Sequence, residues 1–200
     1  MTAIASLLRE HATVHMPAVA DAVFHLPEDL ISGLDEAAMS ATPHGANSVV
    51  WLLWHIARVE DACIAAGLLG QPQVLDDPAA DWPRKLGVTR RDQGEGMTRA
   101  EVAEFSATCS VQAVRDYRDA VGRHTRALVE ALEPKVLARL VSQDDVAQAI
   151  QAGAFGPDDQ QLVGLPLENL LWWWGVQHSS YHIGQIALVR SLVVRGAPVD

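Results

Sequence analysis

The stretch that decides the fold is residues 166–195, PLENLLWWWGVQHSSYHIGQIALVRSLVVR, a long apolar segment that contains two histidines. Its apolar residues recur at helical spacing, and Pro166 suits the first turn of a helix, so we expect a helix to about Arg195. His178 and His182 are four residues apart. They therefore share one helix face, with Cβ atoms about 6 Å apart, and both imidazoles can reach one ion.

A third histidine, His55, lies in a second strongly apolar segment, Trp51-Leu-Leu-Trp-His-Ile-Ala-Arg. The charged residues that follow point mostly away from the face of His55: Arg58, Glu60 and Asp61. If the two helices pack face to face, the three histidines offer three neutral nitrogens and leave one coordination position open. That arrangement is typical of a catalytic metal site and not of a closed structural one.

The composition limits which classes of protein the chain can belong to. With 200 residues, 49% hydrophobic and 20% charged, the chain fits one soluble globular domain, residues 1–200, that buries roughly 70% of its unfolded surface. The net charge of −10 repels phosphate backbones and disfavours nucleic-acid binding. Two isolated cysteines, Cys63 and Cys109, favour a reducing cytoplasm. The N-terminus does not read as a signal peptide, and no apolar run is long enough to cross a membrane.

The rest of the chain predicts an all-α fold with four long helices. Their expected bounds are about Ala3 to Phe24 with a bend or division at Pro17, Asn47 or Ser48 to Leu69, Thr98 to Leu132 with a break near Cys109-Ser110, and Pro166 to Arg195. The connection 70–97 is long and rich in Gly and Pro, which indicates a functional loop or a crossover. We therefore expect a four-helix bundle with a long crossover between its second and third helices, which then run parallel. Residues 134–165 are expected to form an irregular connection with one short helix.

The helix motifs resemble those of a known family. The segment Trp51-Leu-Leu-Trp-His-Ile-Ala-Arg-Val-Glu-Asp61, followed by His178-x-x-x-His182-x-Gly184-Gln185-Ile186, resembles the DinB/YfiT-like superfamily of bacterial metal-binding four-helix bundles. The resemblance implies a divalent metal, most often zinc or nickel, held by His55, His178 and His182, and frequent homodimers. Members include thiol-dependent transferases and isomerases that use mycothiol, bacillithiol or glutathione. Where relatives often show His-His-Arg-Gly-Gln, this chain has Tyr181 and Ile183, which leaves the specific activity open.

Residues around the three histidines are candidates for the pocket. Trp174, one turn before His178, and Trp51 are expected to line the metal cavity. Tyr181 and Gln185 are expected on the inward face and orient water or substrate there, or simply pack. Trp172, Trp173 and Trp174 sweep about 200° of helix surface, so at least one of them is expected to contact a partner.

His15 repeats the four-residue spacing with His11 on the first helix. It is a candidate for a fourth ligand or for a hydrogen-bonding partner of the ligands. The alternative is an exposed or hydrogen-bonded role elsewhere.

The chemistry favours thiol transfer. A metal held by three imidazoles keeps its full charge and acidifies a bound thiol or water. Hydrolysis also needs a base, and the nearest carboxylate on the helix, Glu168, lies ten residues from His178, about 15 Å along the axis. We therefore expect a thiol to be transferred to a small electrophilic substrate. The alternatives are a metal-dependent hydrolase, a non-catalytic metal-binding helical dimer such as a stress-related binding protein, and a metal-free bundle.

Overall fold

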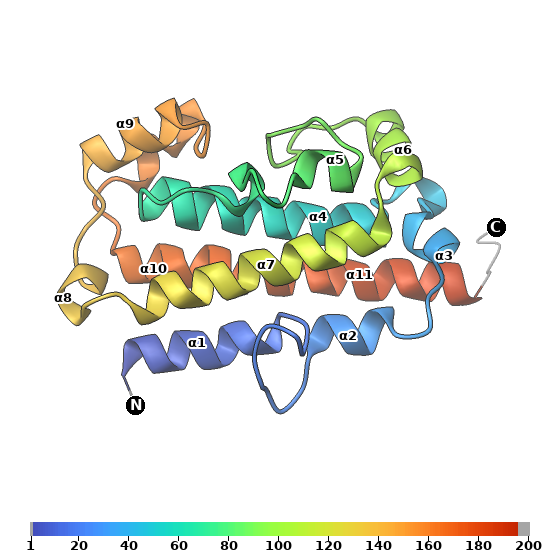
Figure 1. Ribbon diagram of the computed structural model, residues 1–200, viewed down its shortest axis with the longest axis horizontal. Helices are drawn as coiled ribbons and strands as arrows, with labels where there is room; N and C mark the ends of the chain where they lie inside the picture. Colours follow the sequence, from blue (N-terminus) through green and yellow to red (C-terminus); the bar gives the residue numbers. More distant parts are fainter. Residues whose placement is uncertain (1, 196–200) are drawn as a thin grey trace.

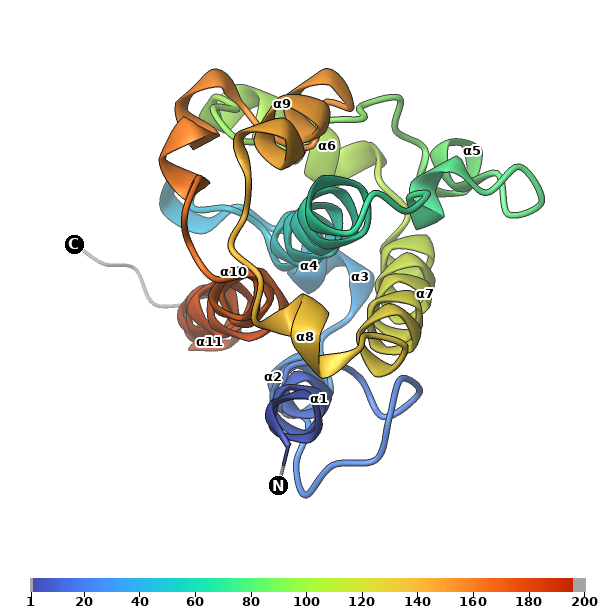
Figure 2. The same cartoon turned by 90° about the vertical axis from the view of Figure 1, so that its left-hand side faces the viewer.

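The computed structural model describes residues 2–195, which are helical throughout apart from connections and one isolated bridge between Leu140 and Pro166. The longer helices form four columns, which lie side by side in Figures 1 and 2. The columns are α1 (Ala3–Thr13) followed by α2 (Leu26–Ile31); α4 (Val49–Val59) continued by a π-helical segment (Glu60–Leu68); α7 (Val111–Glu130); and α10 (Leu167–Trp172) continued by a π-helical segment (Trp173–Gln177) and α11 (His178–Arg195). The prediction of an all-α four-helix bundle is confirmed. No helix of these residues is long and apolar enough to cross a membrane.

The crossover is also confirmed, because α4 and α7 run in the same direction in Figure 1. The chain returns between them through residues 70–97, which contain a 3₁₀ turn (Val74–Asp76) and α5 (Trp82–Leu86). The other short elements are α3 (Glu36–Ser40), a 3₁₀ turn (Pro43–Gly45), α6 (Arg99–Thr108), α8 (Pro134–Leu137), α9 (Gln143–Gln151) and a 3₁₀ helix (Pro157–Leu162). Residues 134–165 thus hold more helix than the single short one predicted.

Side-chain caps set several of these boundaries. The Ser48 hydroxyl accepts a hydrogen bond from the Trp51 amide at 3.0 Å, which starts α4 where predicted. Thr98 and Glu101 form a capping box, which starts α6 at the predicted boundary. Cys109 ends α6 and Ser110 caps α7, so the break predicted there is present.

Two predicted boundaries are wrong. The first helix ends at Thr13 and not near Phe24, because Pro17 lacks the amide hydrogen that a continuing helix needs. Helical structure resumes only at Leu26. Pro166 is the residue before the first helical turn and not part of it, since α10 begins at Leu167.

Helix α4 is the centre of the fold. All its residues are buried, and it contacts α7, α11, α3 and α6. The apolar core forms two clusters, one around Trp54 and Tyr117 and the other around Ile56 and Trp174. Because α4 is covered on all sides, the polar side chains on and just after it are also buried and need partners within the protein.

Candidate metal centre

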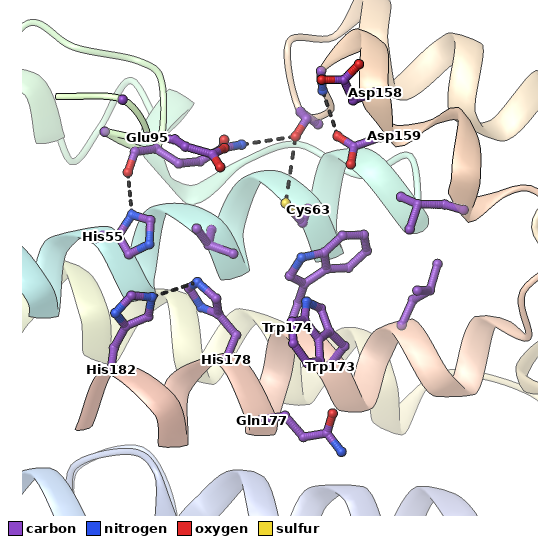
Figure 3. Close-up of a pocket in the computed structure, with 18 of the residues that line it drawn as sticks. His55, Cys63, Glu95, Asp158, Asp159, Trp173, Trp174, Gln177, His178 and His182 are labelled. Atoms are coloured by element: carbon purple, nitrogen blue, oxygen red, sulfur yellow. Dashed lines mark hydrogen bonds between the residues drawn. The ribbon is translucent and has the colours of Figure 1, made fainter. Parts of the chain in front are cut away.

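Three imidazoles from two helices converge in the bundle, as Figure 3 shows. His55 comes from α4, and His178 and His182 come from the first turns of α11. One ring nitrogen of each lies within 4.8 Å of the others, and the Nε2 atoms of His178 and His182 are 3.1 Å apart. Two nitrogens bound to one tetrahedral zinc ion lie about 3.3 Å apart, given Zn–N bonds of about 2.0–2.1 Å. The donor set and its spacing therefore fit a divalent metal.

Hydrogen bonds on the far side of two rings fix their orientation. The His55 Nδ1–H donates to the backbone carbonyl of Gln93 at 2.5 Å, and the His182 Nδ1–H donates to the Gln185 side-chain oxygen at 2.9 Å. Each ring then keeps its Nε2 lone pair for a ligand bond. Such outer hydrogen bonds are usual for metal-binding histidines and set the tautomer.

Burial keeps the histidines neutral, which metal binding requires. Desolvation lowers the pKa of His55 to about 4. Desolvation, together with the neighbouring His182, lowers the pKa of His178 to about 3. The pKa of His182 is lowered by burial as well. All three rings are therefore uncharged near neutral pH.

The histidines lie on the wall of a cavity of about 1300 Å³. Trp51 and Trp174 line it, and the Trp51 ring stacks on His55 with centroids 4.8 Å apart. The structure does not bring Tyr181 or Gln185 into the cavity wall. Tyr181 is 67% exposed and packs against the edge of the His182 ring at 5.0 Å, whereas Gln185 acts through its hydrogen bond to His182.

His15 lies in a second polar cluster and not with the three histidines. The Nε2 atoms of His11 and His15 each lie 2.9 Å from a different oxygen of Glu60, and all three residues are buried. Burial works against ionisation of Glu60, yet the two histidines hold its pKa well below the ordinary value. The grouping has metal-ligand chemistry. A cation there is disfavoured because the buried guanidinium of Arg118 already places a positive charge near the cluster, where it helps to lower the pKa of His15.

A buried network that sequence reasoning missed anchors the 70–97 connection. The guanidinium of Arg58 donates to Asp61 at 3.1 Å, to Gln73 at 2.9 Å and to the carbonyls of Arg91 and Asp92. It also donates to the Tyr117 hydroxyl of α7, which in turn donates to Asp61 at 2.6 Å. The carbonyl of the next residue, Gln93, holds His55. Through this network, α7, α4 and the 70–97 connection together position the Gln93 carbonyl, which orients the candidate ligand His55.

Carboxylates from two connections complete the cavity wall, and they were not predicted because they are far from the histidines along the chain. Glu95 comes from the 70–97 connection, and Asp158 and Asp159 come from the 3₁₀ helix Pro157–Leu162. Figure 3 places them across the cavity from His178 and Trp174. The expectation that no carboxylate lies near the site therefore holds for α11 but not for the cavity as a whole.

Fold and site together define a crossover four-helix bundle with a three-histidine cavity. Residues 21–186 match the DinB superfamily, so the chain belongs to that family. No curated protein matches it. Among solved structures it is similar to a conserved protein from Enterococcus faecalis, with a TM-score of 0.66 and 19% identity over 96% of this chain and 95% of the other. That likeness shows the fold alone.

Proposed function

We propose that this protein is a divalent-metal-dependent transferase, or isomerase, that uses a low-molecular-weight thiol on a small electrophilic substrate. Zinc or nickel would be held by His55, His178 and His182, and the thiol would be mycothiol, bacillithiol or glutathione. The single observation that carries the proposal is the convergence of three neutral imidazoles on the wall of a 1300 Å³ cavity. Membership of the DinB superfamily supports it. We place the activity in the cytoplasm, which the two free, buried cysteines favour.

A bound divalent ion supplies Lewis acidity, which lowers the pKa of a thiol that reaches it. The chain itself prepares the site. The carbonyl of Gln93 and the side chain of Gln185 hold two of the rings, and Trp51 covers His55 and keeps water from one side of it. These contacts pre-orient the donors, which lowers the cost of assembling the site.

The one cysteine on the cavity wall does not replace an external thiol. Cys63 is buried, its thiol faces the Ala154 carbonyl at 3.7 Å, and burial raises its pKa well above the ordinary value. A thiol held protonated is a poor nucleophile. The reacting thiolate is therefore expected to come from solution.

Elemental analysis of the purified protein tests the metal assignment. We expect one equivalent of zinc or nickel in the parent, none in His178→Ala, and one in the control His44→Ala, which changes an exposed histidine. The loaded protein should then consume a thiol in the presence of an electrophile. Full metal content in His178→Ala contradicts the ligand assignment, and absence of thiol consumption by the loaded parent contradicts the transferase.

A hydrolase is a second candidate, and a specific observation favours it. Glu95, Asp158 and Asp159 line the same cavity as the histidines, so a general base for water is at hand. Hydrolysis and thiol transfer give different products. A product that forms without thiol and is lost in Glu95→Gln or Asp158→Asn supports hydrolysis.

A non-catalytic metal-binding homodimer is the remaining alternative. Helix α11 exposes large apolar side chains that do not line the cavity, including Tyr181 (67%) and Leu188 (60%). Contiguous exposed apolar groups mark interfaces. Sedimentation of the parent against Tyr181→Glu and Leu188→Glu tests the dimer, and a monomeric parent rules it out.

A further inference from the structure

The charged side chains of the cavity all have one sign. Glu95, Asp158 and Asp159 are the acidic residues of its wall, and no lysine or arginine is among the described residues that line it. The whole chain carries −10 and adds a potential of the same sign. Charges of one sign in a cavity with low-dielectric walls focus the field inward and concentrate ions of the opposite sign.

Aromatic residues line the same cavity as these carboxylates. The cavity-lining residues Trp172, Trp173 and Trp174 belong to the helical column opposite the two acidic connections (Figure 3). Trp173 is 52% exposed and Trp174 is 8% exposed, so one ring is open to solvent and one lies deeper. The face of an indole attracts cations, and the attraction grows when the cation is desolvated.

We propose that this part of the cavity, between the acidic connections and the three tryptophans, is a subsite for organic cations with an apolar body, such as substituted ammonium groups, and that it excludes anions. The inference rests on the proposed function and deepens it, since it assigns a charge class to the electrophilic substrate of the same cavity, whereas the thiol would bind at the three histidines. Ligands with an ionised carboxylate and no compensating charge bind weakly here, and amine-bearing ligands bind well. Amide side chains of Asn169 and Gln177 on the same column provide neutral hydrogen-bonding groups for the rest of the ligand.

Three probes of similar shape and different charge test the subsite. These are benzyltrimethylammonium, benzyl alcohol and phenylmethanesulfonate, added to the purified protein. None carries a thiol and none is a strong metal ligand, so the result is independent of catalysis. The measurement is the shift of the tryptophan indole N–H signals in a titration followed by NMR. Trp54 and Trp82 are buried outside the cavity wall and serve as internal references.

At low ionic strength we expect the cation to bind at least about tenfold more tightly than the sulfonate, with the neutral probe between them. The ratio should fall as salt is added, because the mouth of the cavity is open to solvent. Signals of the wall tryptophans should move, and those of Trp54 and Trp82 should not.

A pair of double variants separates the local effect from net charge. Glu95→Gln with Asp158→Asn removes two cavity carboxylates, whereas Glu104→Gln with Asp144→Asn removes two exposed carboxylates that do not line it. We expect the first pair to reduce the cation preference at least about threefold, and the second pair to leave it unchanged.

Equal binding of the sulfonate, or equal loss of preference in both double variants, overturns the inference. If the protein holds its metal and consumes thiol yet shows no cation preference, the subsite fails while the proposed function stands. If the protein prefers the cation but binds no metal, the result supports the subsite and contradicts the proposed transferase.

Discussion

Replacing Arg58 with lysine tests whether the buried network positions the candidate ligand His55. The Arg58 side chain is 1% exposed, and each of its three guanidinium nitrogens donates to a different acceptor, on Asp61, Gln73 or Asp92. The single ammonium group of a lysine cannot reach all of these acceptors. Two or three buried hydrogen bonds are lost, each contributing about 1 kcal/mol net. We expect the free energy of unfolding to fall by about 2–3 kcal/mol. We expect metal affinity to fall about 10–100-fold, because the Gln93 carbonyl no longer holds His55 in a fixed orientation.

Urea unfolding measures the stability, and competition with a chelator measures the metal affinity. Arg84→Lys is the matched control, because Arg84 is 79% exposed and pairs only with Asp81, so both quantities should change little. Leu7→Ala controls for lost stability alone. It opens a buried site on α1 and costs about 2–5 kcal/mol, but leaves the network intact. If Arg58→Lys loses stability yet binds metal as tightly as the parent, the link from the network to His55 is refuted.

Two further predictions concern the cluster around Glu60. Burial lowers the pKa of His15 from 6.5 to about 3, so the unfolded chain takes up this proton first and metal-free protein should lose stability as the pH falls from about 6.5 to 3. Urea unfolding across that range should show the loss, and His15→Gln should reduce its slope without abolishing it, because the lowered pKa values of His55, His178 and His182 contribute the rest; a slope unchanged by the variant would argue against the role of His15. A Cβ on Gly122 would lie 2.5 Å from the His15 ring, so Gly122→Ala should cost about 1–3 kcal/mol in thermal unfolding. Gly184→Ala, with nothing within 4 Å of its Cβ, should instead stabilise the helix by about 0.5–1 kcal/mol, and equal effects of the two would contradict the packing described.

The elements that the sequence predicts well are those set by local chemistry. Ser48 and the Thr98–Glu101 pair are short-range capping signals, and each starts a helix where expected. The crossover follows from the length of the 70–97 connection, since a short loop would force antiparallel neighbours. The first helix was predicted too long because its apolar pattern continues past Pro17, and a single proline outweighs that pattern.

The polar core was harder to predict because its partners are distant in sequence. The charged side chains that follow His55 point away from its face of the helix, as expected, but they are buried and not exposed to solvent: Arg58, Glu60 and Asp61. Residues from α1, α7 and the 70–97 connection cover them, and hydrogen bonds across 13 to 59 positions add to the local Arg58–Asp61 ion pair. Helix periodicity describes one helix at a time, so it places a residue on a face without saying what covers that face.

The π-helical segment Trp173–Gln177 explains why Tyr181 does not lie where the sequence predicts. Helical spacing places Tyr181 on the inward face with the candidate ligand histidines, whereas in the structure its side chain is exposed. At about 100° per residue, the buried residues before this segment, Leu167, Leu170 and Leu171, centre on one direction. The buried residues after it, Ser179, His182, Ile183, Ile186 and Val189, centre about 100° further round. A π turn takes up one extra residue and so rotates everything that follows by about that amount. His182 stays inward under either count, whereas Tyr181 moves from the inward face to solvent.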